Sequence, residues 1–443
     1  MVAWRSTLVA ALVVLVVSGA MPAQASGSAL GSWTRAPDLP HAHIGHTATL
    51  LADGRVLIAG GIDQRGVATA NAELFDPISN RWSAAASMHA ARYGHGATLL
   101  ADGDVLVAGG QQSGNGSANA DLASAEVYDP RANRWKTVAP MHAARPTPTA
   151  VRLHDGRVLI VGGIAHPPDA TAPAPSPEQA EIYDPAPNAW SFAGAGLRPL
   201  NERAVTLMPD GSVLVSGGST EFDFATTDAE LFDPQANTWQ PTSASLADSR
   251  LGHTATLLRD GRVLLVGGYT TPQEQSLGQV YPSNALLMTS EIFDVDVGTD
   301  VRAASSTISR FDHTATLLSN GMVLVVGSAY DRHGQAQLFD PHNGGRWIAT
   351  PMAMDRYLHT ATLLRDGRVL IVGGYGTESA NTAWIFSLSP ADQPSPWIGA
   401  IELIVTGTVS IALLFAGLTI VRRRKLIPRR RLTGDDESEW LDP

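Results

Sequence analysis

Alternating apolar and polar positions recur along this chain in one sixteen-residue phrase, which is clearest at residues 359–374, HTATLLRDGRVLIVGG. Its two apolar runs flank an Asp-Gly or Asn-Gly dipeptide. Such a dipeptide between alternating runs predicts a β-hairpin, and it favours a type I′ turn, in which both central residues have positive φ. The dipeptide occurs seven times, as Asp53-Gly54, Asp102-Gly103, Asp155-Gly156, Asp210-Gly211, Asp260-Gly261, Asn320-Gly321 and Asp366-Gly367. Seven hairpins at a spacing near fifty residues predict a repeat fold.

Each repeat continues with two further strand-like segments, joined by a turn that contains Asp-Pro and Asn. In the first unit this turn is Asp76-Pro77 with Asn80, and Trp82 follows it. Proline presets φ for the turn, and Asn tolerates its left-handed position. We therefore expect four strands in each unit, with the Trp packing between neighbouring units. In the fifth unit neither Pro nor Trp follows Asp294.

The seventh unit lacks a fourth strand, and the start of the chain supplies a spare one. Trp33 precedes His46 by the same distance as Trp82 precedes His95. Residues 31–37 therefore read as a strand that completes the last unit, closes the ring and removes both open sheet edges. The pattern predicts an all-β protein, a seven-bladed β-propeller closed by its N-terminal strand.

Residues 92–135 carry the run RYGHGATLL, then VLVAGG, then AEVYDPRANRW. This pattern resembles the kelch repeat, and the resemblance covers residues 26–390. It implies a propeller like the central domain of galactose oxidase. The resemblance says little about function, because kelch propellers serve as protein-binding modules, as sugar-binding modules and as enzyme domains.

The two ends of the chain have the composition of a secretion signal and a membrane anchor. Residues 1–25 combine Arg5, an apolar run and an A-x-A site, which predicts a signal peptide, with an uncleaved signal anchor as the alternative. An uncharged stretch near the other end is followed at once by a basic cluster, which predicts one transmembrane helix with a cytoplasmic tail. We expect a propeller at 26–390, a linker at 391–397, a membrane helix at 398–421 and a basic, then acidic tail at 422–443.

Composition narrows the chemistry further. The net charge of −11 argues against a nucleic-acid partner. The absence of cysteine excludes disulfides, thiolate metal sites and a cysteine nucleophile. It also removes the Tyr–Cys crosslink that a resemblance to copper-radical oxidases would require, so we expect neither a metal nor a cofactor. Only two of the 31 basic residues are lysine, a bias that favours a bacterial source. Together with the predicted signal peptide and membrane helix, it leads us to expect the propeller on the outside of a bacterial cell membrane.

Residues that recur in most units are expected to belong to the scaffold. The Gly-Gly pairs end the second strand, where backbones approach closely. Histidines 46, 95, 253, 313 and 359 begin the innermost strand, too far apart around a ring to share a metal ion. We expect two further repeated sets to pair within or between blades: Glu73, Glu126, Glu181, Glu230 and Glu291, and Arg92, Arg145, Arg250, Arg310 and Arg356.

The loops on one face vary in length and sequence, and variable loops on a constant scaffold are where binding is usually placed. Their aromatic and acidic side chains suit sugar rings, although ordinary loop packing is an equal alternative. The arginines at the mouth of the expected central channel form a second group of candidates for ligand binding. The candidates for ligand binding are Phe222, Asp223, Tyr269, Tyr330, Tyr375, Arg92, Arg250, Arg310 and Arg356.

The fourth unit breaks the repeat where the inner strand begins. Glu202 and Arg203 stand there, and they are candidates for an acid–base group and an anion anchor, with sequence drift as the simpler explanation. We expect a monomeric, membrane-tethered binding module for a glycan, an envelope polymer or a protein. A cofactor-free carbohydrate mutarotase or epimerase is the alternative, and a structural spacer is a third.

Overall fold

The computed structural model describes residues 30–114, 117–163, 180–194, 202–219, 224–270, 286–327, 335–342, 345–353, 355–378 and 380–389. The chain divides into two compact units, Met1–Ser389 and Pro390–Pro443. The predicted signal peptide, linker, membrane helix and tail lie outside the described residues. Within the ranges given, no helix is long and apolar enough to cross a membrane.

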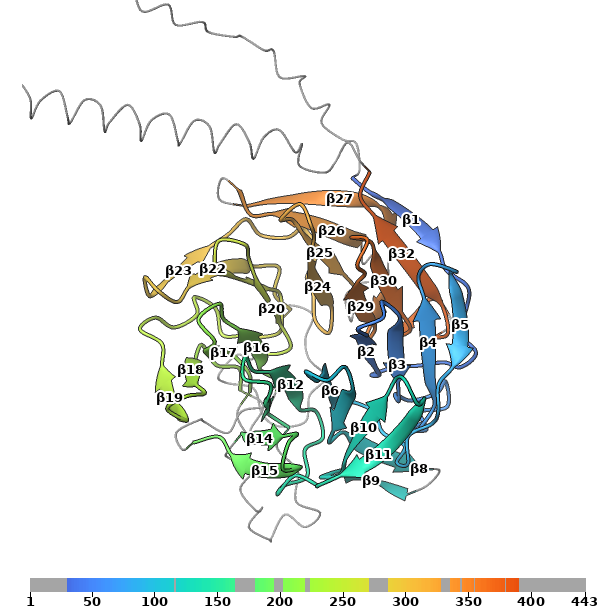
Figure 1. Cartoon of the computed structure of the whole chain (residues 1–443). Helices are drawn as coiled ribbons and strands as arrows, with labels where there is room; N and C mark the ends of the chain where they lie inside the picture. Colours follow the sequence, from blue (N-terminus) through green and yellow to red (C-terminus); the bar gives the residue numbers. More distant parts are fainter. Residues whose placement is uncertain are drawn as a thin grey trace, which may run out of the picture. The chain divides into compact units, whose positions relative to one another are not determined.

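The described part of the first unit contains seven four-stranded antiparallel sheets arranged as the blades of a propeller (Figure 1). Each of the first six blades uses four strands in chain order, from the centre outwards. The six are β2 (Thr47–Leu50), β3 (Val56–Ala59), β4 (Ala72–Asp76) and β5 (Arg81–Ala84); β6 (Gly96–Leu99), β7 (Val105–Ala108), β10 (Ala125–Asp129) and β11 (Arg134–Val138); β12 (Thr149–Arg152), β13 (Val158–Val161), β14 (Glu181–Asp184) and β15 (Ala189–Phe192); β16 (Ala204–Leu207), β17 (Val213–Ser216), β18 (Ala229–Asp233) and β19 (Thr238–Pro241); β20 (Thr254–Leu257), β21 (Val263–Val266), β22 (Ser290–Asp294) and β23 (Thr299–Arg302); and β24 (Thr314–Leu317), β25 (Val323–Val326), β26 (Gln335–Asp340) and β27 (Arg346–Ala353).

The seventh blade joins the two ends of the propeller. It consists of β29 (Thr360–Leu363), β30 (Val369–Val372), β32 (Ala383–Ser387) and β1 (Ser32–Arg35). Strand β1 pairs with β32 in an antiparallel register that places Trp33 opposite Phe386. The innermost strands β2 and β29 of blades 1 and 7 are also in contact. The predicted closure of a seven-bladed ring by the N-terminal strand is confirmed.

The Asp-Gly hairpins form, but their turn type differs from the prediction. Gly54 has φ of 92°, whereas Asp53 is not among the residues with positive φ. The Gly54 N–H donates to Leu51 O at 3.0 Å, and the Arg55 N–H donates to Asp53 Oδ1 at 3.0 Å. A turn followed by one left-handed glycine is a three-residue loop rather than a type I′ turn. The side chain of Asp53 accepts a hydrogen bond from the backbone N–H two residues further on, and this keeps the φ of Asp53 negative. The prediction of a type I′ turn was therefore wrong.

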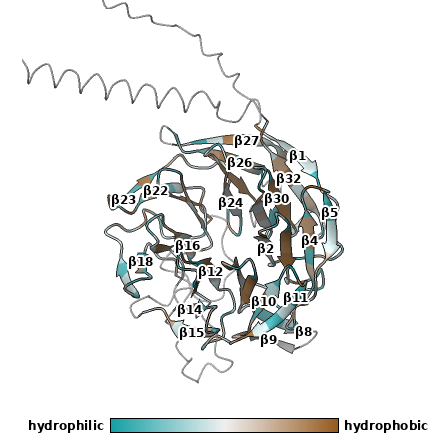
Figure 2. Cartoon of the chain, in the orientation of Figure 1, coloured by the Kyte–Doolittle hydropathy of each residue, from teal (hydrophilic) through white to brown (hydrophobic). Residues whose placement is uncertain are grey.

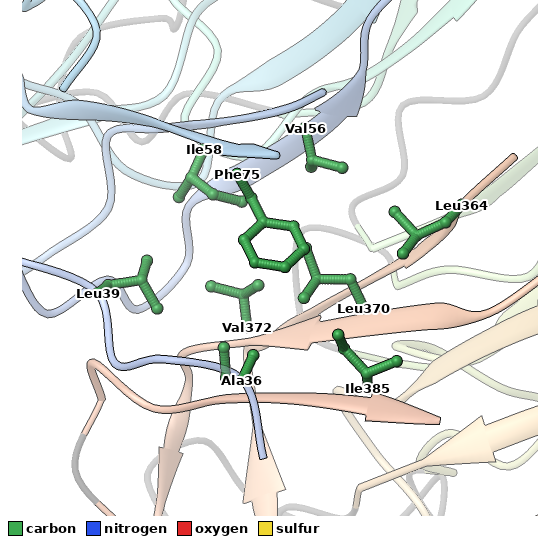
Figure 3. Packing of buried hydrophobic residues seen from close by; sticks show 10 residues of the cluster. Ala36, Leu39, Val56, Ile58, Phe75, Leu364, Leu370, Val372 and Ile385 are labelled. Atoms are coloured by element: carbon green, nitrogen blue, oxygen red, sulfur yellow. The ribbon is translucent and has the colours of Figure 1, made fainter. Parts of the chain in front are cut away.

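The core lies between blades, where apolar faces of neighbouring sheets meet. At the seam of blades 7 and 1, Phe75 packs among Ile58, Leu370, Val372 and Ile385 (Figure 3). Middle strands such as β30 are strongly hydrophobic, and the outer strand β11 is largely hydrophilic (Figure 2). Burying a side chain such as Phe75 contributes about 1.5–3 kcal/mol to the stability of the folded state.

In six blades a repeated tryptophan ties the blade to the one before it, as predicted. In blade 2 the Trp135 ring packs on Tyr128 at 5.0 Å between centroids, and its Nε1–H donates to Ala86 O at 2.7 Å. The preceding turn needs a left-handed residue, which is Asn133 with φ of 47°. In blade 5 the same turn uses Gly298 with φ of 66°, which accounts for the missing Pro-and-Asn pattern there.

Candidate functional site

A layer of buried ion pairs supports the face of the propeller that carries the variable loops, here called the loop face. In blade 2 the Arg92 guanidinium donates to Gly109 O at 2.8 Å and to Glu126 Oε1 at 3.1 Å. Both side chains are almost fully buried. Burial lowers the pKa of Arg92, and the charge of Glu126 acts in the opposite direction. The predicted pairing of the repeated Arg and Glu residues is therefore confirmed in this blade.

The other arginines of this set take the same position with different partners. Arg145 and Arg250 pair with Glu181 and Glu291 in blades 3 and 5. Arg310 donates to Gln337 Oε1 at 2.8 Å. Arg356 pairs with Glu378, a loop residue, at 2.9 Å. Four of these arginines were candidates for ligand binding; their guanidinium groups are directed into the scaffold, and a role in binding stays a prediction.

Two blades fill the arginine position in their own way. In blade 1 the equivalent residue is His43, which is fully buried and lies 2.6 Å from both Gly60 O and Glu73 Oε2. In blade 4 the cation comes from Arg203, whose Nη1 lies 2.7 Å from Glu230 Oε2. Arg203 therefore belongs to the buried layer, whereas Glu202 beside it is exposed. The roles predicted for these two residues, an acid–base group and an anion anchor, stay predictions.

The histidines that begin the inner strands join neighbouring blades. His95 Nε2 lies 2.9 Å from Thr47 Oγ1 of the preceding blade, and His359 Nε2 lies 2.9 Å from Thr314 Oγ1. Burial lowers the pKa of His95 and of His313 to about 3, and the nearby arginines act in the same direction. These rings are neutral at ordinary pH and act as structural links. Across the described ranges, no group of three or more His, Asp and Glu side chains is placed to hold a metal ion.

Directly before these five histidines, and directly before Arg203 in blade 4, one residue adopts the left-handed backbone conformation. We call these six residues the rim: Gly45, Gly94, Glu202, Gly252, Asp312 and Leu358. Their backbones are linked from blade to blade, since Gly94 N–H donates to Gly45 O at 2.8 Å and Gly45 N–H donates to Leu358 O at 3.0 Å. Leu358 N–H donates in turn to Asp312 O at 3.2 Å. Glycine suits this conformation, and three blades replace it.

The rim brings two carboxyl groups into electrostatic contact. Burial, and after it the charge of Glu202, raise the pKa of Asp312 to about 7. No cation is among the causes of that shift. Asp312 thus exchanges its proton near neutral pH next to a second carboxylate, a combination that is typical of functional sites.

Aromatic side chains surround these rim residues. Phe311 lies over Gly252, where a Cβ would collide with its ring. Tyr357 and Tyr375 stack with centroids 5.4 Å apart, on the short ribbon β28 (Arg356–Tyr357) and β31 (Tyr375–Gly376). Leu358 is 38% exposed despite its left-handed φ of 55°. The rim therefore combines exposed apolar surface with a carboxyl pair.

The loop candidates have different outcomes. Phe222, Asp223 and Tyr330 lie outside the described residues. Tyr269 is buried and meets Phe311 edge-on at 6.4 Å, which is loop packing. Tyr375 is 38% exposed and is the candidate that reaches the surface.

Sequence reasoning missed Asp312, Phe311, Tyr357 and Leu358. The sequence carries a signal for this region at the position directly before each inner-strand His. That position is Gly in blades 1, 2 and 5 but Asp312 and Leu358 in blades 6 and 7. A repeated glycine that is lost in particular units marks a backbone position under strain.

A polar hollow of about 560 Å³ also opens on the loop face, beside the closing seam. His41, Asp63, Arg65 and Asn381 contribute to its lining. His41 Nδ1 lies 2.6 Å from Glu73 Oε1, and Asp63 pairs with Arg65. Because His89 and His142 repeat the His–Glu contact in blades 2 and 3, we regard this arrangement as part of the scaffold.

Comparison with known proteins agrees with this architecture. The model of the KLHDC2/KLHL20/DRC7 Kelch-repeats domain matches residues 45–268, just over half of the chain. Kelch-like protein 25 of Xenopus tropicalis is 28% identical over 34% of this chain and 24% of its own length. Kelch-like protein 35 of Mus musculus is 27% identical over 49% of this chain and 33% of its own length. The matches thus span only a quarter to a third of these relatives.

Solved structures share the fold at low identity. A fungal alcohol oxidase of the AA5 family, in complex with copper, aligns over 83% of this chain and 79% of its own, with a TM-score of 0.64 and 19% identity. The structure of YjhT aligns over 71% of this chain and 99% of its own, with a TM-score of 0.54 and 16% identity. The described residues and the absence of cysteine do not fit a copper-radical centre. With its seven blades and the family match over residues 45–268, this chain belongs to the kelch-repeat family of β-propellers.

Proposed function

We propose that this protein is an interaction module that binds a protein partner through the rim of its loop face. The kelch-repeat architecture supports this proposal, because such propellers commonly serve as protein-binding modules. The predicted signal peptide and membrane helix favour a module tethered on the outside of the cell membrane, a placement that rests on the sequence alone.

The observation that carries the proposal is Leu358. A leucine in the left-handed region costs roughly 1–2 kcal/mol relative to glycine at the same position. Leu358 is also 38% exposed, so burial does not offset that cost within the described propeller. A strained, exposed apolar residue at a position that other blades fill with glycine supports a role in binding.

The surroundings of Leu358 indicate the chemistry of the partner. Glu202 and Asp312 are acidic, and Phe311 and Tyr357 present aromatic surface next to them. Carboxylates beside aromatic rings favour a guanidinium or ammonium group, through ion pairing and cation–π contact. We therefore propose that the partner inserts an arginine or lysine side chain, flanked by apolar residues, at the rim.

An array of twelve-residue peptides tests this proposal with the full chain. Peptides that place Arg or Lys between apolar residues should bind, and their charge-reversed versions with Glu should not. Leu358→Gly should weaken binding at least tenfold. Ile78→Gly removes a more exposed apolar side chain from the opposite face and should bind like wild type. Equal binding of acidic and basic peptides, or equal loss in both variants, would refute the proposal.

A glycan ligand is the second candidate, favoured by the exposed ring of Tyr375. A glycan array probed with wild type and Tyr375→Ala separates the two: saturable binding that depends on Tyr375 favours the glycan. The mutarotase alternative now rests on Glu202 with Asp312 rather than with Arg203. Faster interconversion of sugar anomers that Asp312→Asn abolishes would support it.

A further inference from the structure

Blade 5 is closed differently from its neighbours. Asp300 stands opposite Phe293, at the register position where all six other blades place a tryptophan opposite Phe or Tyr. In five of those blades the indole N–H donates to a carbonyl oxygen of the linker from the preceding blade, at 2.5 to 2.7 Å. Asp300 has no indole, so this seam is held by other bonds.

The carboxyl group of Asp300 takes over the contact with the linker. The Ala247 N–H, in the linker from blade 4, donates both to Asp300 Oδ2 at 2.6 Å and to Glu291 Oε2 at 2.9 Å. This single N–H therefore holds Asp300 Oδ2 and Glu291 Oε2 side by side. Two carboxyl groups held this close repel each other unless one of them carries a proton, which the two can then share.

The charges around the pair decide which group is protonated. Glu291 is fully buried and pairs with the Arg250 guanidinium. Arg250 also faces Asp248 at 3.6 Å, and Arg302 pairs with Asp248 at 2.5 Å. Apart from Asp294 at the end of β22, which accepts the Asp296 and Val297 N–H groups in the turn, these are the charged groups on the linker, β22 and β23. From blade 4, the apolar residues Met208, Leu214, Ala229 and Leu231 pack at this seam. Asp300 is therefore left to hold the proton.

We propose that the seam between blades 4 and 5 is closed by a proton shared between Asp300 and Glu291, which makes it the seam that weakens as pH rises from acid to neutral. The seams of the other six blades have a tryptophan, and therefore no titratable group, at the register position of Asp300. The inference is independent of the proposed function, since it concerns the stability of the ring and not its rim.

The sign of the effect follows from linkage. Burial and the charge of Glu291 raise the pKa of Asp300 from 3.8 to about 7. The folded chain therefore keeps a proton that the unfolded chain has released, so the stability contributed by Asp300 is complete below about pH 4 and is lost as pH rises to about 7. One proton corresponds to at most about tenfold in the unfolding equilibrium constant per pH unit.

Urea unfolding of the full chain between pH 4.5 and 8 tests the proposal. Asp300→Asn can donate an amide N–H to Glu291 at every pH, so the ratio of its unfolding constant to that of wild type should fall severalfold per pH unit up to about pH 7 and then level off. Because the buried histidines contribute equally to both proteins, the ratio isolates Asp300.

Two further variants complete the test. Asp296→Asn alters an exposed carboxylate of the same blade and should run parallel to wild type. Asp300→Trp restores the residue of the other blades and should show the same pH dependence as Asp300→Asn, which keeps the proposal testable if the Asn variant does not fold. Parallel pH profiles for wild type and both Asp300 variants would overturn it.

Discussion

The two faces of the propeller are built from the same strands and differ in what fixes them. On the turn face, each Asp-Gly or Asn-Gly turn is fixed locally: the side-chain oxygen of the Asp or Asn accepts the N–H two residues on, in all seven blades. On the loop face, support comes from buried ion pairs between residues far apart in sequence, such as Arg92 and Glu126. Local bonds give a uniform face, whereas a buried charged layer lets the residues above it vary.

The largest expected effect comes from breaking that layer. Arg92→Met leaves Glu126 buried without its cation and removes two bonds to backbone carbonyls, so we expect a loss of about 3–5 kcal/mol in the free energy of unfolding. Urea denaturation measures it. Arg65→Met breaks an exposed pair with Asp63 and should cost less than about 1 kcal/mol. Similar losses in the two variants would remove the distinction between the buried layer and the surface.

A second prediction uses the histidines beneath the rim. Because the folded pKa of His95 is about 3, below its ordinary value of 6.5, the unfolded chain binds a proton that the folded chain does not. Stability is complete above pH 6.5 and is lost as pH falls. Between pH 6.5 and pH 4.5, His95→Gln should lose about 2–3 kcal/mol less of its free energy of unfolding than wild type does. An unchanged acid profile in His95→Gln would contradict the assignment.

The smallest expected effect on stability concerns strain at the rim. Leu358→Gly should raise the free energy of unfolding by about 1 kcal/mol, because glycine adopts the left-handed conformation without cost. Leu358→Ala keeps a Cβ and should show no such gain. If both variants have the same stability, the rim stores no strain at this position.

Much of the scaffold could be predicted because each signal repeats. The hairpins, the closing strand around Trp33 and the pairing of Arg92 with Glu126 all follow from patterns that recur in several units. The prediction of type I′ turns failed because the Asp53 side chain, and not the dipeptide alone, sets the loop.

The candidate site was harder to predict because its geometry depends on residues distant in sequence. The left-handed conformation of Leu358 is held by backbone bonds to Asp312 and Gly45, which belong to other blades. Likewise, the partner of Arg203 is set by the loss of an arginine earlier in the fourth unit, and spacing alone does not reveal this exchange.

The most direct test of the rim as the binding surface combines affinity with stability in one protein. The full-length variant Glu202→Gly, Asp312→Gly, Leu358→Gly should be at least as stable as wild type in urea, because glycine relieves all three left-handed positions. It should bind the basic peptides selected by wild type at least a hundredfold more weakly. A triple variant that retains wild-type affinity for those peptides would contradict the account.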